Sequence, residues 1–416
     1  MPHDVHGFSS MVGTNASKLR SVLKFDVFTS PSSSFGTLGE STILETDWVI
    51  WPRSFPPQVL GKVQYLVTIT QYAQVPNSAG RVHMRDPVTG FEYPPEWSAK
   101  IVDEAWAKLV EQGLAVLNAK GQVLRRGFST GTTAAAACKA AVLSLDGPVE
   151  SVSITLPSGI RLDVPVIGKD GLASCHKFPG DYLDDPTAGA EFVAAAFLVG
   201  EGVQVIPGEG IGEYARTEGT KRTGSPAISP SASGSIILAV SQAKEEMGIR
   251  GVRVELHVVD GEKMAIRTVN PRFGVQDGIS VLGTTGLVDP WDDYVEEGRL
   301  DKLTADKVVL TTGKMGLRLS RLFYPDHEVI LVGQQMLEAV AGAQDQVVVC
   351  GLPGNIIRAV LPHTLEECEC SSFDELATSD RWKGVLGRVF ERYRDLNPKV
   401  KILMLDRSGK ILGEMS

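Results

Sequence analysis

Four short segments carry the glycines, hydroxyls and charged side chains that could hold an anionic ligand. The first, residues 126–133 (RGFSTGTT), precedes an Ala-rich run, and hydroxyls with free backbone N–H groups at a helix N-terminus form an anion site. Ser and Thr also cap ordinary helices, so a plain N-cap is the competing interpretation. Residues 278–286 (GISVLGTTG) hold so much Gly and Thr that ordering them is expensive, which favours a backbone role over a plain tight turn.

The other two segments are less specific. Residues 177–185 (KFPGDYLDD) cluster acids that could orient a ligand, or simply cap and turn the chain. Residues 208–212 (GEGIG) resemble a dinucleotide-binding loop, but the strand, helix and downstream acid of that fingerprint are out of register. We therefore expect a flexible turn at residues 208–212.

The charge of the chain limits its ligands. Its 416 residues include 41 Lys and Arg against 50 Asp and Glu, a formal net charge of −9. That balance excludes a surface built throughout for nucleic acid, and an anionic membrane would repel the protein at long range. An anionic ligand would therefore need local positive charge. Arg125, Arg126, Lys139 and Lys177 lie in or beside the four segments.

Metal, membrane and export signals are weak. The five cysteines and seven histidines show no metal-ligand spacing, so we expect no protein-held metal and reduced, largely buried thiols. The apolar runs are far shorter than the roughly 18 residues of a bilayer-spanning helix. The first residues lack the charged and apolar regions of a signal peptide. The composition therefore predicts a cytoplasmic protein without a membrane span.

The elements that must position the four segments fall into three regions. Residues 1–83 are rich in Ser and Pro, with strand-like stretches at 47–51 and 63–70, and we expect a loosely ordered N-terminal extension. Residues 84–300 predict a mixed α+β domain with hairpins, and residues 301–416 a smaller α/β domain, since three strand–Gly–helix units in a row indicate a parallel sheet. The expected fold class is thus α+β with two domains.

Apolar periodicity predicts the individual elements of these two domains. In the first domain it places helices at residues 96–112, 134–145 and 235–248, a strand pair around 118–121, a hairpin turning at 157–159, and strands at 172–178, 189–199, 203–206 and 252–259. In the second it places strands at residues 307–310, 328–332, 346–350 and 400–405, helices after each of the first three, and a last helix at 381–394.

Taken together, the segments resemble the CbiD family, the cobalt-precorrin-5B C-1 methyltransferases of anaerobic cobalamin synthesis. The resemblance rests on residues 86–97, 124–145, 177–185, 208–212 with 225–231, 269–286, 308–313 and 351–354, in the family's order. It starts at Met84, weakens after His363 and is nearest to archaeal members. Two positions depart: many members have Cys at the place of Thr133, and a Gly-His segment at the place of residues 351–354.

The resemblance implies transfer of a methyl group from S-adenosylmethionine to C-1 of cobalt-precorrin-5B, giving cobalt-precorrin-6A. Cobalt would then be present only within the substrate, which neighbouring enzymes of the pathway could hand over. Positioning alone can supply much of such a rate enhancement. For the corrinoid substrate the expected binding residues are Arg125, Arg126, Thr130, Gly131, Thr132, Lys177 and Asn270, with the basic residues meeting its carboxylate arms. For S-adenosylmethionine they are Gly283, Thr284, Thr285, Thr311, Thr312 and Gly313.

A base is harder to assign. Asp181 and Asp185 are candidates because they are acids in a motif, although a structural cap suits each as well. Two other functions stay open at this point. One is a phosphate- or nucleotide-dependent transferase, against which the missing P-loop Lys-Ser/Thr pair counts. The other is a non-catalytic tetrapyrrole carrier.

Overall fold

The computed structural model describes residues 84–217, 222–291, 298, 300–343 and 345–416 in full, and the backbone of five strands before them. The chain divides into two compact units, residues 1–71 with 162–165, and residues 72–161 with 166–416. In the first unit β1 (Phe25–Thr29) pairs antiparallel with β4 (Trp48–Pro52). Strands β2 (Gly36–Leu38), β3 (Ser41–Glu45) and β5 (Gln64–Val67) form a second small sheet. The expected loose packing of residues 1–83 otherwise lies outside the described residues.

The second unit opens with a small hairpin and two short helices. Strands β6 (Met84–Arg85) and β7 (Glu92–Tyr93) pair, and α2 (Pro95–Ser98) and α3 (Glu104–Glu111) follow. The single helix predicted over residues 96–112 is wrong. The first helix ends at Ser98, and α3 begins separately because Asp103 is an N-cap whose carboxylate accepts from the backbone N–H of Ala105 (2.8 Å). Val102, counted as apolar periodicity, is fully exposed.

A six-stranded sheet forms the centre of this region. Its order is β11-β12-β13-β14-β18-β15, and β15 runs parallel to β18. The strands are β11 (Val149–Thr155), β12 (Arg161–Lys169), β13 (Leu172–His176), β14 (Glu191–Leu198), β15 (Gly202–Pro207) and β18 (Gly251–Val258). The predicted hairpin around residues 157–159 and the strands after it are confirmed.

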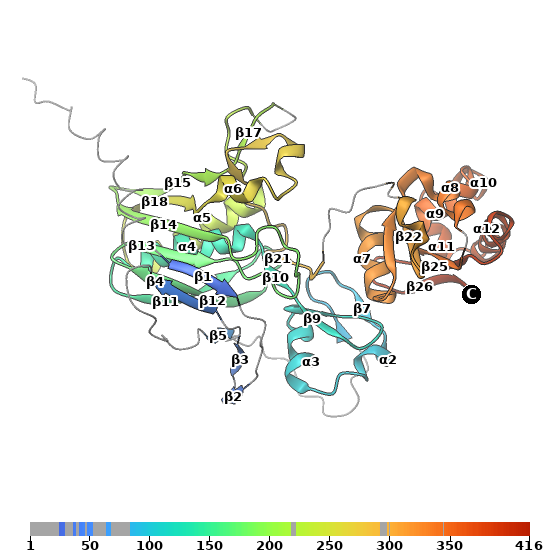
Figure 1. The fold of residues 1–416 in the computed structure, drawn as a ribbon, viewed down its shortest axis with the longest axis horizontal. Helices are drawn as coiled ribbons and strands as arrows, with labels where there is room; N and C mark the ends of the chain where they lie inside the picture. The colour runs from blue at the N-terminus through green and yellow to red at the C-terminus, as the bar shows by residue number, and fades with distance from the viewer. Residues whose placement is uncertain are drawn as a thin grey trace, which may run out of the picture. The chain divides into compact units, whose positions relative to one another are not determined.

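Two helices, α4 (Thr130–Leu143) and α5 (Pro230–Glu246), pack together on this sheet (Figure 1). Each begins earlier than the apolar period predicts, because Ser129 and Ser229 cap the backbone N–H groups of Thr132 and Ala232. The helices run parallel, since Gly131 meets Ala232 near their starts and Lys139 reaches Gln242 farther along. Nearly all of α4 is buried, which suits its run of small alanines.

Short strands link the helix starts to glycine-rich segments. The predicted strand pair around residues 118–121 is confirmed as β8 (Ala115–Leu117) and β9 (Val123–Arg125). Strand β10 (Gly127–Phe128) pairs with β21 (Leu287–Val288). Strand β16 (Gly210–Ile211) pairs with β20 (Gly278–Ile279), and β17 (Glu213–Tyr214) pairs with β19 (Val275–Gln276). The helix α6 (Gly261–Ala265) and the 3-10 turn η1 (Asn270–Phe273) lie between these strands in sequence.

The flexible turn predicted at residues 208–212 is wrong. Gly210 has a φ of +78°, and a Cβ there would lie 2.0 Å from the carbonyl oxygen of Val258. A Cβ on Gly261 would likewise meet the carbonyl oxygen of Gly210 at 2.2 Å. These glycines let three backbone segments cross in close contact, which a side chain would prevent. Residues 208–212 therefore lie where three backbone segments of the chain cross in close contact, and they do not form an open glycine-rich loop.

The last third of the chain forms a five-stranded sheet in the order β23-β22-β24-β25-β26. Four strands are parallel and β26, which the sequence did not predict, is antiparallel. The strands are β22 (Val308–Thr311), β23 (Glu328–Leu331), β24 (Val347–Gly351), β25 (Lys401–Leu405) and β26 (Ile411–Met415). The helices are α7 (Gly313–Phe323), α8 (Met336–Gly342), α9 (Pro353–Val360), α10 (Thr364–Glu367), α11 (Phe373–Thr378) and α12 (Trp382–Leu396), with the 3-10 turns η2 (Leu300–Thr304) and η3 (Gly333–Gln335).

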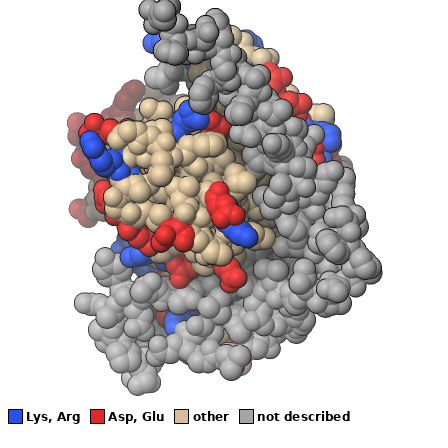
Figure 2. Space-filling model, turned by 90° about the vertical axis from the view of Figure 1, so that its left-hand side faces the viewer, with Lys and Arg blue, Asp and Glu red and all other residues tan. Residues whose placement is uncertain are grey.

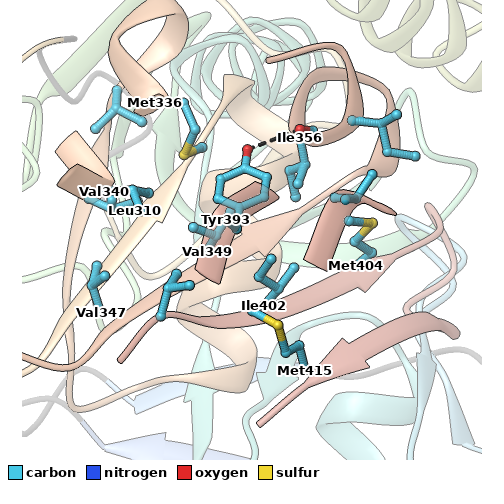
Figure 3. Close-up of a cluster of buried hydrophobic side chains, with 14 of the residues drawn as sticks. Leu310, Met336, Val340, Val347, Val349, Ile356, Tyr393, Ile402, Met404 and Met415 are labelled. Carbon is cyan, nitrogen blue, oxygen red and sulfur yellow. Dashed lines mark hydrogen bonds between the residues drawn. The ribbon is translucent and has the colours of Figure 1, made fainter. Parts of the chain in front are cut away.

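A buried apolar cluster joins these helices to the sheet (Figure 3). Its largest fully buried side chain is Tyr393, whose hydroxyl donates to the backbone carbonyl of Ile356 (2.9 Å). That bond satisfies the polar atom that burial would otherwise penalise. The predicted strand–Gly–helix units and the α+β fold class are thus confirmed. Among the described residues, no helix combines the length and apolarity that crossing a bilayer requires.

Candidate active site

The hydroxyls at the start of α4 bind the glycine-rich segment at residues 280–286. Thr130 Oγ1 donates to the carbonyl of Ser280 (3.1 Å) and accepts from the N–H of Leu282 (2.8 Å). Thr132 Oγ1 donates to the carbonyl of Gly286 (2.7 Å). The segments at residues 126–133 and 278–286, which were expected to bind different ligands, therefore bind each other.

The three residues of this segment expected to hold S-adenosylmethionine differ in exposure. Gly283 (φ +153°) leaves so little room that a Cβ would lie 2.3 Å from Oγ of Ser129. Thr285 Oγ1 bonds within its own turn, donating to the carbonyl of Leu287 (3.1 Å). Thr284 is exposed. Of the three, Thr284 thus has a side chain in contact with solvent.

Arg125 and Asp181, expected to bind substrate and to act as a base, form an ion pair with each other. The guanidinium donates to Oδ1 of Asp181 at 2.6 and 2.9 Å, and the backbone N–H of Arg125 donates to Oδ2 (2.7 Å). The backbone beside them is equally close, because a Cβ on Gly180 (φ +65°) would lie 2.5 Å from the backbone of Arg126. The acidic loop at residues 177–185 is therefore held against β9 and β10.

Lys177 and Asp185 form a second pair, which is almost wholly buried. Asp185 also accepts from the backbone N–H (2.9 Å) and the hydroxyl (2.7 Å) of Thr187. Burial lowers the pKa of Lys177 below its ordinary value, against the opposing attraction of Asp185. Each charge in this pair has its partner within the same loop.

Arg126 belongs to a buried set of four charges, here called the ion cluster: Asp86, Arg126, Asp289 and Arg318. Its guanidinium donates to Asp289 (2.7 Å) and twice to Asp86 (2.7 and 2.9 Å). Arg318 donates to the same two acids at 2.9 and 3.0 Å. The side chain of Arg126 is only 1% exposed. Two positive and two negative charges thus balance inside the protein.

The ionisation of the cluster follows from this pairing. Burial by itself would raise the pKa of Asp86, but hydrogen bonding and attraction from Arg126, with attraction from Arg318, hold that pKa below its ordinary value. Asp289 shows the same balance, with its pKa lowered. For Arg126, burial opposes the charge, yet Asp289 and Asp86 raise the pKa further. Asp86, Asp289 and Arg126 are therefore each held in their charged form.

Asn270 is buried next to the contact between Thr130 and Ser280. Its side chain donates to the carbonyl of Gly278 (3.4 Å) and accepts from the hydroxyl of Ser280 (3.0 Å). Ser280 in turn accepts from Thr130 through its carbonyl. Ser280 thus links Asn270 to Thr130.

Thr311, Thr312 and Gly313 lie apart from that group in the fold, at the carboxyl edge of the parallel sheet. Thr311 is buried and donates to the carbonyl of Cys350 (2.7 Å). Thr312 accepts from the side-chain amide of Asn355 (3.3 Å), and no side chain caps α7. Gly313 has a φ of +66°, and a Cβ there would have nothing within 4 Å. This strand end is therefore open at Gly313.

Three cysteines and Thr133 are buried. Burial raises the pKa values of the thiols of Cys138, Cys175 and Cys350. The hydroxyl of Thr133 donates to the carbonyl of Ser129 (3.0 Å). Among the described residues, no group of three or more His, Cys, Asp or Glu could hold a metal ion.

Sequence reasoning missed Asp86, Asp289 and Arg318. Asp86 and Asp289 each precede a proline, which signals a turn but not a partner. Arg126 meets Asp289 across 163 positions and Arg318 meets Asp86 across 232. Pairing over such distances leaves no spacing pattern to read.

A further missed pair is Glu191 and His176, opposite each other on β14 and β13. His176 Nε2 lies 3.9 Å from Oε2 of Glu191, and both side chains are mostly buried. Burial raises the pKa of Glu191 to about 7 and lowers that of His176. Burial thus disfavours the charged form of each partner.

The raised pKa of Glu191 predicts how stability depends on pH. In the unfolded chain its pKa is near the ordinary 4.5. Folding therefore favours the protonated form, and ionisation in the unfolded state penalises folding progressively as the pH rises from 4.5 through 7. Glu191→Gln should stabilise the protein by under about 1 kcal/mol near pH 5 and by up to about 3 kcal/mol at pH 8. Urea unfolding at the two pH values measures this, and an equal effect at both would refute it.

Known proteins are similar in sequence to this chain over most of its length. The CbiD family model matches residues 117–290. The cobalt-precorrin-5B C(1)-methyltransferase of Methanoculleus marisnigri is 48% identical over 335 residues, covering 80% of this chain and 99% of that protein. The protein of the same name from Methanoregula boonei is 43% identical over 332 residues, with the same coverage. A crystal structure of the cobalamin biosynthesis protein cbiD from Archaeoglobus fulgidus is 30% identical, with a TM-score of 0.46, over 77% of this chain and 100% of that one. At nearly half identity over the full length of a relative, the chain belongs to the CbiD family of cobalt-precorrin-5B C(1)-methyltransferases.

Proposed function

We propose that this chain transfers a methyl group from S-adenosylmethionine to C-1 of cobalt-precorrin-5B in cobalamin biosynthesis. One observation carries the proposal: 48% identity along 99% of a relative that has this name. No specific observation favours the phosphate-dependent transferase, and the glycines at residues 210 and 212 pack closely against other backbone. No specific observation favours a non-catalytic carrier.

When bound, S-adenosylmethionine supplies an electrophilic methyl group, so the protein's own task is to place the reacting atoms in line. The residues around α4 suit that task because they form a rigid frame. Thr130 and Thr132 fix the segment at residues 280–286, while Arg125 fixes the acidic loop through Asp181. We assign Asp181 and Asp185 to positioning, since each already neutralises a cation.

For S-adenosylmethionine we propose the carboxyl edge of the parallel sheet, where open α/β sheets hold their ligands. The residues there fit such a group. Gly313 leaves space that a Cβ would fill, and the uncapped backbone N–H groups of α7 can donate to a carboxylate. The hydroxyl of Thr312 lies at the same edge. These residues would hold the ligand by its polar ends.

The reaction test is anaerobic incubation of the full chain with cobalt-precorrin-5B and S-adenosylmethionine. A product heavier by one methyl group, formed together with S-adenosylhomocysteine, is the expected result. Thermal stabilisation by S-adenosylhomocysteine but not by ATP should accompany it. Corrinoid binding without S-adenosylhomocysteine binding or turnover would instead indicate a carrier. The cytoplasmic location and the transfer of substrate from neighbouring pathway enzymes belong to the same proposal.

The proposal also predicts that residues 1–83 are dispensable for methyl transfer. The alignment with the first relative covers 80% of this chain and almost all of that protein. A chain that begins at Met84 should therefore stay folded and keep its turnover number within about twofold, by analogy with surface changes away from a site. Loss of soluble protein, or of turnover at unchanged stability, would show that the extension supports the core or the site.

A further inference from the structure

The ion cluster is buried, unlike the charged side chains that Figure 2 shows at the surface among uncharged ones. None of its four side chains is more than 15% exposed. A surface pair can shift at little cost because water replaces a lost contact, whereas buried partners must keep their geometry to stay paired. The ion cluster can therefore hold the elements that it joins in one fixed arrangement.

Asp289 joins the ion cluster to the start of α4. It follows β21, which pairs with β10. Three residues before it, the carbonyl of Gly286 accepts from the N–H of Ser129 (3.0 Å) and from the hydroxyl of Thr132 (2.7 Å). Arg126 donates to Oδ1 of Asp289 (2.7 Å) from the chain just before α4. The carboxylate of Asp289 is therefore fixed relative to the start of α4.

Arg318 brings α7 to the same carboxylate. Its Nε donates to Oδ2 of Asp289 (2.9 Å), and its Nη2 donates to Oδ2 of Asp86 (3.0 Å). Both bonds come from one planar guanidinium, so together they set the orientation of α7 as well as its distance. Gly313, the first residue of α7, precedes Arg318 by five residues, which is about 7.5 Å along a helix axis. The strand end proposed for S-adenosylmethionine thus lies close to the contact with Asp289.

The two sides of this contact belong to the two halves of the proposed reaction. The methyl donor is proposed at the start of α7, and the frame that positions the corrinoid is built around α4. An in-line displacement needs its reacting atoms about 3–3.5 Å apart, and a misplacement of about 1 Å can cost about a hundredfold in rate. Any movement of α7 against Asp289 would change that distance.

We propose that Arg318 is a positioning residue for methyl transfer, which acts by holding α7 on Asp289 at the separation that the displacement requires. The inference rests on the proposed function, which places the donor at α7 and the corrinoid at the frame around α4. It assigns a role in the reaction to a residue that sequence reasoning missed, because the partners of Arg318 lie 29 and 232 positions away.

Two variants alter the geometry of this contact and keep every charge. Arg318→Lys replaces the planar fork by a single ammonium group, and Asp289→Glu lengthens the acid by one methylene group. In single turnovers, with enzyme in excess over cobalt-precorrin-5B, each should slow methyl transfer about a hundredfold. The affinities for S-adenosylhomocysteine and for the corrinoid should stay within about twofold, because only the alignment of the two ligands is lost.

Two control variants on α12 separate positioning from a general loss of stability. Arg388→Lys makes the same replacement in an exposed pair with Glu367 (3.0 Å), and it should leave the rate unchanged. Val389→Ala shortens a fully buried side chain of the same sheet domain. It should lower the unfolding temperature by several degrees without slowing methyl transfer, provided that the assay runs well below that temperature.

Hydrogen exchange gives a readout that does not depend on turnover. In Arg318→Lys, amide exchange followed by mass spectrometry should become faster at residues 284–289 and 313–318 and stay unchanged in α12. Arg388→Lys should show no faster exchange in either of those two segments.

The outcomes for this inference and for the proposed function are distinct. If the natural chain transfers the methyl group and Arg318→Lys and Asp289→Glu do so at the natural rate, the function stands and the inference is overturned. An equal loss of rate in Val389→Ala would also overturn it, because instability alone would then explain the effect. If the natural chain transfers no methyl group, the proposed function fails, and the role assigned to Arg318 in the reaction fails with it.

Discussion

Replacing Arg126 with Met should lower the free energy of unfolding by about 3–5 kcal/mol, because it leaves two carboxylates facing one guanidinium inside the protein. Asp86 is wholly buried and cannot regain water without opening the fold, and Asp289 has only 15% of its side chain exposed. Urea unfolding measures the loss. The expected defect is in stability, so KM for the corrinoid should change no more than KM for S-adenosylmethionine in whatever protein remains folded.

Two further variants test whether charge balance is the cause. Arg126→Met combined with Asp289→Asn restores neutrality, and it should recover about 1–2 kcal/mol of the loss. Lys120→Met breaks an exposed pair with Asp326 and should change stability by less than about 1 kcal/mol. If the double variant is no more stable than Arg126→Met, lost packing rather than unpaired charge explains the effect.

Gly131→Val should lower the free energy of unfolding by about 3 kcal/mol or more and reduce the yield of folded protein. A Cβ at residue 131 would lie 2.9 Å from the Cβ of Ala232 and 2.9 Å from the carbonyl oxygen of Leu282. Neither α5 nor the segment at residues 280–286 can move away without breaking its bonds to α4. Gly131 lies in right-handed helix, so lost space rather than a left-handed backbone is the cause.

Gly234 provides the matched control, because it lies inside α5 with nothing within 4 Å of its Cβ position. Gly234→Ala should stabilise the protein by about 0.5–1 kcal/mol through helix propensity. Gly131→Ala gains the same helix propensity, but its Cβ would contact α5. It should therefore lower the free energy of unfolding overall. Equal effects of the two alanine substitutions would contradict the close approach of the helices.

Elements with a local signal could be predicted from the sequence. The hairpin around residues 157–159 and the strand–Gly–helix units near Gly313, Gly333 and Gly351 have apolar periods and turn residues within one short stretch. The predicted starts of α4 and α5 were wrong, because a helix begins at its N-cap residue and the apolar period does not mark that residue. Ser129 and Ser229 extend their helices four or five residues before the first periodic apolar position.

The site was predicted as a set of residues but not as a set of contacts. Thr130, Thr132 and Asn270 were singled out, and all three bond to the segment at residues 278–286. Their partners could not be predicted, because a hydroxyl that caps a helix, binds a ligand or binds another loop has the same sequence. The same ambiguity placed Arg126 at a substrate carboxylate when Asp86 and Asp289, distant in sequence, already occupy it.

The ion cluster has a consequence for the order in which the newly made chain folds. Asp86 and Arg126 leave the ribosome early, but Asp289 follows Arg126 by 163 residues and Arg318 follows Asp86 by 232. Until Arg318 emerges, burying the other three would leave an excess negative charge without a counterion. We therefore expect nascent chains stalled before Arg318 to remain sensitive to protease around Asp86, and chains stalled after the parallel sheet has emerged to become resistant in one step. Early resistance would show that Asp86 and Arg126 suffice to close this region during synthesis.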